Sequence, residues 1–413
     1  MKVIIVGAGL AGLTCAKVLH ERGAEVIVFE ASDGVGGRVR TDEKNGFLLD
    51  RGFQVYFTAY PAARRHLDHE KLNLKPFDPG AIVCQGRQKS VLSDPRRDPG
   101  AALPSLVADV ATFGDKLRTL KLAASNVSGG AEAAGESKDG DSTTFEYLRE
   151  QGFSARFIDD FFRPFYGGIF LDRTLGTSSR VFRFTFRMLA TSETAVPAWG
   201  MGEIPRQLAS HLPKDAVELN SPVEDLLWEE GRVPGVRANG NEYEADAVVV
   251  ATDAPSAGRL TNEGVPRAAV GQTCIYYATG GLNRENKILL NADDGGLLNN
   301  VVQISNVSRS YAPESQNLVC AVALGGMELP DEELYRRGVE EISEWYPNAD
   351  LHPLAIYRIP FAQFAQPPGT HDRLPANRTA TPGLILAGEY TEDSSINGSI
   401  LSGEKAALEV LGS

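Results

Sequence analysis

Apolar residues near the amino terminus follow two different periods. Residues 3–6 form an unbroken β-branched run, which predicts a buried parallel strand. Between Leu10 and Arg22 the apolar positions recur at helical spacing, and Gly23 ends that segment. Residues 25–29 then predict a second strand. This order predicts the start of an open parallel sheet with helices packed on it.

Three later segments have patterns of similar clarity. Residues 247–250 form another buried run that ends in the small pair Ala251-Thr252. Small residues at a strand end allow close approach of a cofactor, and ordinary tight packing is the alternative. Residues 331–345 have the spacing of an amphipathic helix with an acidic first turn. Residues 383–389 predict a strand, and a helix follows to about residue 411.

An aromatic segment with helical periodicity spans residues 144–189. We expect its helix to break near Pro164 and at Gly167-Gly168. Its aromatic face is interpreted either as a core helix, or as the wall of an apolar substrate cavity or a membrane-dipping surface. The residues that would line such a cavity are Phe161, Arg163, Phe165 and Tyr166.

A glycine pattern, Gly7-x-Gly9-x-x-Gly12, lies between the first strand and the first helix. Gly7 would let the chain turn, Gly9 would leave room for a pyrophosphate, and Gly12 would let the helix pack on the strand. The unpaired N–H groups of the helix start, at Leu10 and Ala11, favour a negative charge. The pattern therefore predicts a dinucleotide site, and a turn with only a packing role is the alternative.

Residues after the second strand indicate which dinucleotide is bound. Glu30 ends the strand, beside Ala31, and its carboxylate can accept both hydroxyls of an adenosine ribose. Gly36-Gly37 offers a second close backbone approach, and Arg38 offers fork-shaped donors for phosphate. A surface salt bridge is the alternative role for Arg38. Because a simple NAD site has no such second loop, the combination predicts bound FAD.

A further contact with this cofactor is expected near the carboxyl terminus. Gly388-Glu389 ends a strand, and a helix opens soon afterwards at Ser395, Ile396 and Asn397. A reduced flavin is anionic near N1 and O2, so N–H groups at this helix start would stabilise it. A generic carboxyl-terminal helix is the alternative.

Composition limits the classes of function. The 413 residues suffice for two domains, and the net charge of −13 argues against nucleic acid and against electrostatic docking to anionic lipid. Any membrane contact would have to be apolar. The four cysteines and six histidines lack metal-ligand spacing, so we expect no metal. The first strand begins at Lys2, which leaves no room for a leader, and no apolar run reaches about eighteen residues. We expect a cytoplasmic protein, peripheral to a membrane at most.

These motifs together resemble the flavin-containing amine oxidase superfamily, which includes monoamine oxidases, protoporphyrinogen oxidases and carotenoid desaturases. The segments that carry the resemblance are Gly7–Gly12 with Glu30, Gly36–Thr41, Asp50–Gln54, Trp199–Pro205, Leu386–Thr391 and Asn397–Gly403. The resemblance covers most of the chain. The sequences of the last two segments are closer to those of plant-type phytoene desaturases and their bacterial relatives.

The resemblance implies a role for several residues. Glu30 would hold the adenosine ribose, and Arg38 with its neighbouring glycines would line the pyrophosphate and ribityl chain. The backbone of Val223 would meet adenine. The turn Gly52-Phe53-Gln54 would lie beside the isoalloxazine ring, and Glu389 would contact the ribityl-phosphate portion.

Two departures from amine oxidases affect the expected substrate. Those enzymes commonly carry a lysine next to the flavin, and this chain has Thr273 at the similar position. They also carry an aromatic residue before the last helix, where this chain has Ser395. An aromatic cage for an amine nitrogen is therefore not evident. Glu389 also replaces the usual aspartate of the desaturases, and Asn397-Gly398-Ser399 replaces the usual Glu-Gly-Ala.

The chain is thus expected to be an α/β protein with a Rossmann-type FAD-binding domain, a parallel sheet with helices, and an interleaved mixed α+β substrate domain. The FAD-binding domain would comprise residues 1–75, 200–255 and 375–413, and the substrate domain 76–199 and 256–374.

The expected reaction is dehydrogenation of a small apolar, isoprenoid or carotenoid-like substrate, with hydride transfer to flavin N5. The electron acceptor would be oxygen, a quinone or another compound, and no catalytic acid or base is assigned. The alternatives are an amine oxidase, a protoporphyrinogen oxidase-like enzyme, and a non-catalytic lipid-binding protein of the GDP-dissociation-inhibitor type.

Overall fold

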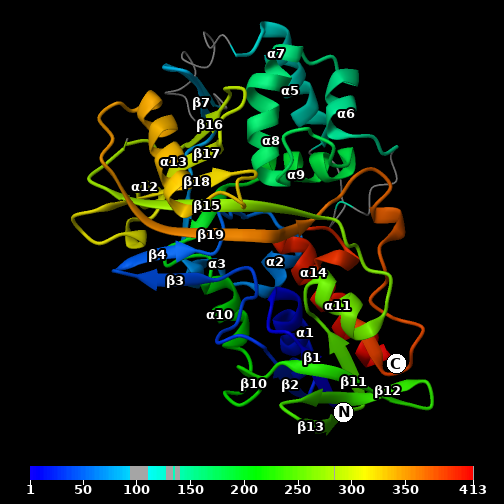
Figure 1. The fold of residues 1–413 in the computed structure, drawn as a ribbon. Helices are drawn as coiled ribbons and strands as arrows, with labels where there is room; N and C mark the ends of the chain where they lie inside the picture. The colour runs from blue at the N-terminus through cyan, green and yellow to red at the C-terminus, as the bar shows by residue number, and fades with distance from the viewer. Residues whose placement is uncertain (94–109, 127–133, 135–139, 283, 413) are drawn as a thin grey trace.

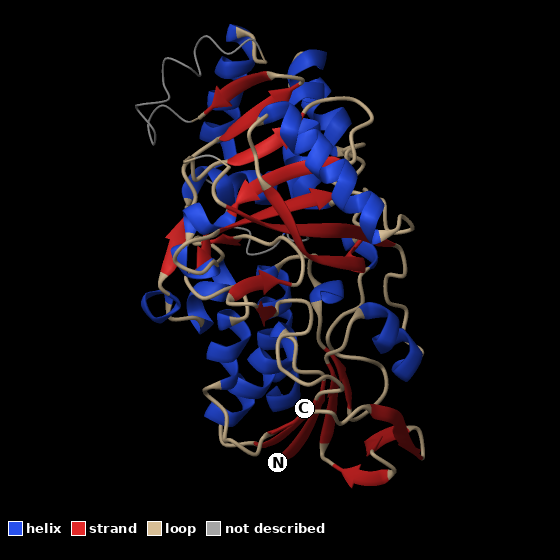
Figure 2. Ribbon diagram, turned by 60° about the vertical axis from the view of Figure 1, so that its left-hand side comes forward, coloured by secondary structure: helices blue, strands red, loops and turns tan. Residues whose placement is uncertain are grey.

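The computed structural model describes residues 1–93, 110–126, 134, 140–282 and 284–412. Two sheets dominate it: a parallel sheet near the chain termini and a larger mixed sheet at the middle of the molecule (Figure 1). Both termini lie at the end built on the parallel sheet, in the two views (Figures 1 and 2). The α/β class expected from the sequence is confirmed.

The parallel sheet joins distant parts of the chain. In spatial order its strands are β10 (Val217–Glu218), β2 (Glu25–Phe29), β1 (Lys2–Val6), β14 (Ala247–Val250) and β20 (Leu384–Leu386). Every neighbouring pair is parallel, and the strands predicted in these segments are confirmed. The boundaries proposed for the two domains stay a prediction.

Helices cover one face of the parallel sheet, and a small antiparallel sheet covers the other. The helices are α1 (Leu10–Glu21), α14 (Ile396–Gly412) and α10 (Glu203–Ala209), which pack together. The small sheet is β11 (Val223–Glu229), β12 (Arg232–Ala238) and β13 (Asn241–Glu244), followed after β14 by α11 (Ala254–Thr261). Val233 and Val236 of β12 pack on Ile4 and Val248, so both sheet faces are buried.

The mixed sheet contains seven strands. In spatial order they are β19 (Leu351–Phe364), β15 (Ala269–Thr279), β18 (Asn317–Ala323), β17 (Leu298–Gln303), β16 (Ile288–Asn291), β7 (Ala81–Gln85) and β8 (Gln88–Leu92). Helix α13 (Asp331–Trp345) packs against it through Leu334, Ile342 and Trp345, and its predicted bounds are confirmed.

A helical layer lies beside the mixed sheet at the top of Figure 1. It consists of α5 (Phe113–Asn126), α6 (Thr144–Glu150), α7 (Ala155–Phe157), a π-helix (Ile158–Phe162), α8 (Arg163–Phe170) and α9 (Ser179–Thr191). The helix break predicted at Gly167-Gly168 is wrong, because α8 continues to Phe170 and ends where Leu171 takes a left-handed conformation. Pro164 instead sits in the first turn of α8, where its missing N–H costs little.

Shorter elements connect these layers. They are β3 (Thr41–Lys44), β4 (Phe47–Asp50), β5 (Tyr56–Phe57), α2 (Pro61–His66), α3 (His69–Leu72), β6 (Leu74–Pro76), β9 (Thr194–Pro197), α12 (Ile304–Val307) and 3-10 turns at Arg309–Tyr311, His371–Arg373 and Glu389–Thr391. Among the described helices, none is both long and apolar enough to cross a bilayer.

Candidate cofactor site

The first glycine turn contains two crowded positions and one open position. Gly7 has φ +107°, and a Cβ there would lie 2.8 Å from the carbonyl oxygen of Ala251. A Cβ on Gly12 would lie 2.0 Å from the carbonyl oxygen of Gly7. Gly9 has φ −73°, and a Cβ there would meet no atom within 4 Å. Gly7 and Gly12 are therefore required by packing, whereas Gly9 leaves a space above the start of α1.

The second glycine loop lies against the first. The backbone N–H of Gly36 donates to the carbonyl oxygen of Ala8 at 2.8 Å. Gly37 has φ +57°, and a Cβ on it would come within 3.5 Å of the Cα of Gly9. The two segments that the sequence assigned to one cofactor are therefore adjacent, and both present bare backbone at the same place.

Strand ends and a helix contact fix the rest of this turn. The N–H of Ala251 donates to the carbonyl oxygen of Val6 at 2.8 Å, and Thr252 follows within 3.3 Å of a Cβ built on Gly7. Leu10 and Ala11 are buried at the start of α1, and a Cβ on Gly403 of α14 would lie 2.2 Å from the carbonyl oxygen of Ala11. The start of α1 therefore lies between β14 and α14.

Glu30 stabilises the first glycine turn and lies at its edge. Its carboxylate accepts the N–H of Ala8 at 2.7 Å and the N–H and hydroxyl of Ser32 at 2.9 and 2.6 Å. A carboxylate has about four acceptor positions, so about one is left for a ribose hydroxyl. The carbonyl oxygen of Glu30 accepts the N–H of Ser221, which brings Val223 at the start of β11 to this edge, while Ala31 is exposed. The ribose role stays a prediction.

Arg38 links the second glycine loop to the carboxyl-terminal segment that contains Glu389. Its Nη1 donates to Oε1 of Glu389 at 2.6 Å and to the carbonyl oxygen of Ala362 at 2.9 Å. Oε2 of Glu389 accepts the hydroxyl of Ser394 at 2.8 Å. Glu389 is only 6% exposed, so the pair is not the surface salt bridge considered from the sequence. The pair places both predicted cofactor contacts beside each other.

The turn Gly52-Phe53-Gln54 completes the site. Nε2 of Gln54 donates to the carbonyl oxygen of Arg38 at 2.9 Å, and its Oε1 is buried without a donor among the described residues. An unpaired buried acceptor costs about 1–3 kcal/mol, which a ligand N–H or O–H would recover. The N–H of Phe53 points to the sulfur of Cys274 at 3.0 Å. The space at Gly9 and the open acceptor of Gln54 fit FAD.

The start of α14 is arranged as an N-cap. The Ser395 hydroxyl accepts the N–H of Gly398 at 2.8 Å and donates to the Asp393 carboxylate. Oδ1 of Asn397 accepts the N–H of Ala62 at 2.9 Å, and Ile396 is half-buried. The strand expected to reach Glu389 ends at Leu386, and the positive end of the α14 dipole follows the 3-10 turn at Glu389–Thr391, where a negative charge would be stabilised.

A buried carboxylate holds a neighbouring segment in place. Asp50 accepts the Thr41 hydroxyl at 2.5 Å, the Met201 N–H at 2.9 Å and the Tyr311 hydroxyl at 2.8 Å. Burial raises the pKa of Asp50 to about 6, although these hydrogen bonds lower it. Asp50 thereby links the turn after β4 to the segment that begins at Trp199. Asp50 belongs to one of the segments that carry the family resemblance, but its role in holding these segments together could not be assigned from the sequence.

Asp50 predicts a pH dependence of stability. Its folded pKa of about 6 lies above the ordinary aspartate pKa of 3.8, so the folded state binds more protons between these values and stability falls as pH rises through them. The loss is on the order of 3 kcal/mol and is complete above about pH 6. We expect the stability difference between wild type and Asp50→Asn to change by this amount in denaturant titrations. A difference that is constant with pH would contradict it.

The predicted substrate residues divide into two groups. Phe161 and Phe165 are half-buried and their rings stack at 5.3 Å, while Tyr166 is 2% exposed and packs on Phe162. This burial and ring packing support the core interpretation for Phe162 and Tyr166, and the substrate role of Phe161, Phe165 and Tyr166 stays a prediction. The carbonyl oxygen of Ile169, at the end of α8, accepts Nε2 of Gln363 at 2.8 Å.

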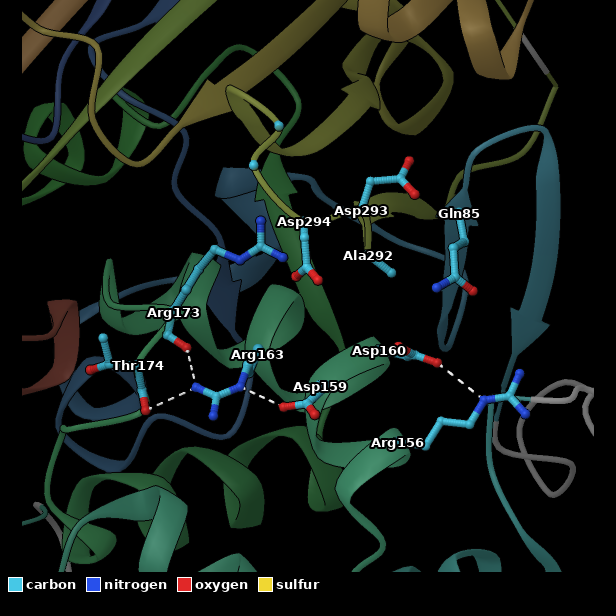
Figure 3. A pocket seen from close by; sticks show the side chains of 12 residues that line it. Gln85, Arg156, Asp159, Asp160, Arg163, Arg173, Thr174, Ala292, Asp293 and Asp294 are labelled. Carbon is cyan, nitrogen blue, oxygen red and sulfur yellow. Dashed lines mark hydrogen bonds and ion pairs between the residues drawn. The ribbon is translucent and has the colours of Figure 1, made fainter.

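Arg163, the fourth predicted substrate residue, lines a surface pocket. Its guanidinium pairs with Asp159 at 2.7 Å and donates to the carbonyl oxygens of Arg173 and Thr174 (Figure 3). It lines a polar surface pocket of about 880 Å³ together with Asp294. The structure does not bring Arg163 together with the cofactor residues. Its role as a polar point of the substrate cavity stays a prediction.

Sequence reasoning missed the residues of β19 that meet Arg38. Ala362 supplies its backbone oxygen, and the ring of Phe361 lies 5.7 Å from the guanidinium. The pairing of β19 with β15 contains register shifts, one of them between Val270 and Gln272. No local pattern would have indicated which residue of β19 faces Arg38, because that depends on this pairing.

Comparisons with known proteins point to one family. A family model described as flavin containing amine oxidoreductase matches residues 10–411. The 15-cis-phytoene desaturase of Synechococcus elongatus is 24% identical over 468 aligned positions that cover 100% of this chain and 96% of that protein.

Solved structures share the fold over the full length. A candidate protoporphyrinogen oxidase from Exiguobacterium sp. 255-15 is 16% identical with a TM-score of 0.77, covering 100% of this chain and 99% of that one. Putrescine oxidase is 20% identical with a TM-score of 0.74 and covers 100% of both chains.

Proposed function

The chain belongs to the flavin containing amine oxidoreductase family and is an FAD-dependent oxidoreductase, and on this premise we propose that it dehydrogenates an apolar substrate of the isoprenoid or carotenoid type. When bound, FAD supplies the acceptor for a hydride from a substrate C–H. The residues of the chain then have to bind the cofactor, orient the substrate and exclude water.

One observation supports an apolar substrate. Adjacent residues of β19 contact both sides of the site: Ala362 accepts from Arg38, and Gln363 donates to Ile169 at the end of α8. The end of α8 therefore contacts the strand that also holds Arg38. Tyr166 and Phe170 are buried aromatic side chains near this end of α8, and a substrate bound beside it would meet an apolar surface, which supports an apolar substrate over an ionic one.

Two side chains reduce the support for an amine substrate. The Thr273 hydroxyl is buried and donates to the carbonyl oxygen of Gly325 at 3.1 Å, so this position supplies no amino group. Ser395, in place of an aromatic residue, is engaged with Asp393. A porphyrinogen is the second candidate, because its macrocycle is large and apolar apart from two propionate side chains, and the Exiguobacterium structure shares the full-length fold.

Anaerobic flavin reduction tests the proposal. The holoenzyme is mixed with 15-cis-phytoene in detergent, with protoporphyrinogen and with putrescine, and loss of the oxidised flavin band is followed. We expect bleaching with phytoene and none with putrescine. Bleaching with protoporphyrinogen alone would select the second candidate, and bleaching with putrescine alone would overturn the proposal. Light-driven reduction of the same sample shows that its flavin is competent in every case.

A further inference from the structure

One face of β15 contacts residues 50–54, the segment that we call the Phe53 turn. The Tyr276 hydroxyl donates to the carbonyl oxygen of Asp50 at 2.7 Å. The Cys274 sulfur accepts the N–H of Phe53 at 3.0 Å. Alternate residues of a strand share a face, so both contacts come from the same side of β15. The Cys274 side chain is fully buried, and it supplies the turn with a hydrogen-bond partner from the core.

Gln272, on the same face of β15, contacts the turn at a third point. Its Nε2 lies 3.5 Å from the carbonyl oxygen of Phe53, a long hydrogen bond, and its Oε1 accepts the Cys274 thiol at 3.7 Å. Gly52 has φ +96°, and a Cβ there would lie 3.0 Å from the same Nε2. A glycine has a wide choice of conformations, so contacts from outside the turn have to select the observed one.

Thr273 points to the opposite side of β15. Its hydroxyl donates to the carbonyl oxygen of Gly325 at 3.1 Å. The pairing with β19 shifts register at Gly271, where a Cβ would lie 2.6 Å from the carbonyl oxygen of Ile359. Such an irregularity sets which residues of a strand face each side. The residues of β15 that approach the Phe53 turn here are therefore the two neighbours of Thr273.

The Phe53 turn is connected to the cofactor residues through Gln54. Nε2 of Gln54 donates to the carbonyl oxygen of Arg38 at 2.9 Å, and its Oε1 has no donor among the described residues. Phe53 and Gln54 are half-buried, whereas Gln272 and Cys274 are 5% and 0% exposed. The surface left for a ligand therefore belongs to the turn, and the two side chains of β15 act on a ligand through it.

We propose that Cys274 and Gln272 are positioning residues for FAD, which hold the backbone of Phe53 and thereby set the position of Gln54. The inference rests on the assignment of this turn to FAD, and it is independent of the substrate. Because the N–H and the C=O of Phe53 are both held from one strand, the peptide units on either side of it are fixed relative to the mixed sheet. A side chain that only filled space would act through its volume, whereas a positioning side chain acts through its hydrogen bond.

Substitution of Cys274 separates these two roles. Cys274→Ala removes the acceptor, and Cys274→Ser restores an oxygen that can accept the Phe53 N–H. We expect the FAD dissociation constant to rise about tenfold in Cys274→Ala and to return to within about threefold of wild type in Cys274→Ser. A buried hydroxyl costs stability, so the serine variant should be no more stable to denaturant than the alanine variant. Tighter FAD binding in a variant that is not more stable would not come from packing.

Hydrogen exchange tests the contact in the apoprotein, without FAD. The Phe53 N–H, followed by mass spectrometry of the peptide that contains it, should exchange at least about fivefold faster in Cys274→Ala than in wild type. Cys274→Ser should exchange at nearly the wild-type rate. Gln272→Met keeps the length of the side chain and removes both polar atoms. We expect it to raise the FAD dissociation constant about threefold, because its bond to Phe53 is long.

Two buried side chains serve as matched controls. Thr273 and Cys84 are both 0% exposed. Thr273→Val removes a hydrogen bond on the other side of β15, and Cys84→Ala removes a thiol from β7 of the same sheet. Both variants should keep the FAD dissociation constant and the Phe53 exchange rate of wild type.

Several outcomes would overturn the proposal. They are unchanged FAD binding in Cys274→Ala, no recovery in Cys274→Ser, unchanged Phe53 exchange in Cys274→Ala, and an equal loss of FAD binding in Thr273→Val. If Cys274→Ala does not fold, the comparison of Gln272→Met with Thr273→Val decides by the same criteria. No substrate enters these measurements, so an error in the proposed substrate class would leave every one of them unchanged.

Discussion

Gly9→Ala is expected to yield a folded protein that purifies almost without flavin. The backbone of Gly9 has φ −73° and ψ 179°, which alanine adopts without strain, and its Cβ would meet no protein atom within 4 Å. The added methyl would occupy the space over the start of α1 in which the pyrophosphate must approach the backbone. We expect FAD affinity to fall at least about a hundredfold, or about 3 kcal/mol.

The stability of the apoprotein separates this effect from misfolding. Gly9 is the N-cap of α1, and alanine there should cost at most about 1 kcal/mol. Gly12→Ala provides the contrast, because its Cβ would lie 2.0 Å from a carbonyl oxygen and should prevent normal folding. Gly264→Ala is the matched control, since Gly264 is exposed and also has no neighbour within 4 Å of a Cβ. Flavin absorbance per polypeptide and thermal denaturation measure both quantities. Full flavin content in Gly9→Ala would place the pyrophosphate elsewhere.

The contrast between these glycines shows what the sequence could predict. The spacing of Gly7, Gly9 and Gly12 after a β-branched run indicated the turn, its helix and the strand that follows, because these depend on local pattern. The same was true of the helix at residues 331–345. Local pattern was less reliable at Gly167-Gly168, where packing of α8 in the helical layer outweighs the low helix propensity of glycine.

Contacts between residues far apart in the sequence could not be predicted from local sequence pattern. The sequence assigned Arg38 and Glu389 separately to the cofactor, and nothing in either segment indicated that they bind each other at 2.6 Å. The role of Asp50 likewise depends on Met201 and Tyr311, which lie far away in sequence. Such networks depend on how β4, β15 and the segment after β9 contact one another. The periodicity of hydrophobic residues along the chain does not predict these contacts.

A double-mutant cycle on Arg38 and Glu389 should show that the pair has two separable roles. Arg38→Met leaves the Glu389 carboxylate, 6% exposed, without its cation, and we expect a loss of about 2 kcal/mol in stability. This figure is below that for fully buried pairs, since Arg38 is 31% exposed. Adding Glu389→Gln removes the unpaired charge, so the double variant should recover much of that stability.

Flavin content then decides what Arg38 does. If its guanidinium also serves the cofactor through Nε and Nη2, which have no acceptor among the described residues, the double variant regains stability but stays deficient in FAD. Recovery of flavin together with stability would instead limit Arg38 to positioning Glu389. Arg237→Met is the control, because Arg237 forms a comparable 2.9 Å pair with Glu242 on an exposed hairpin and should leave both readouts unchanged. The result that we expect, restored folding without restored flavin in the double variant and normal flavin in the single variant Glu389→Gln, would assign the phosphate-side donors of the site to Arg38 itself.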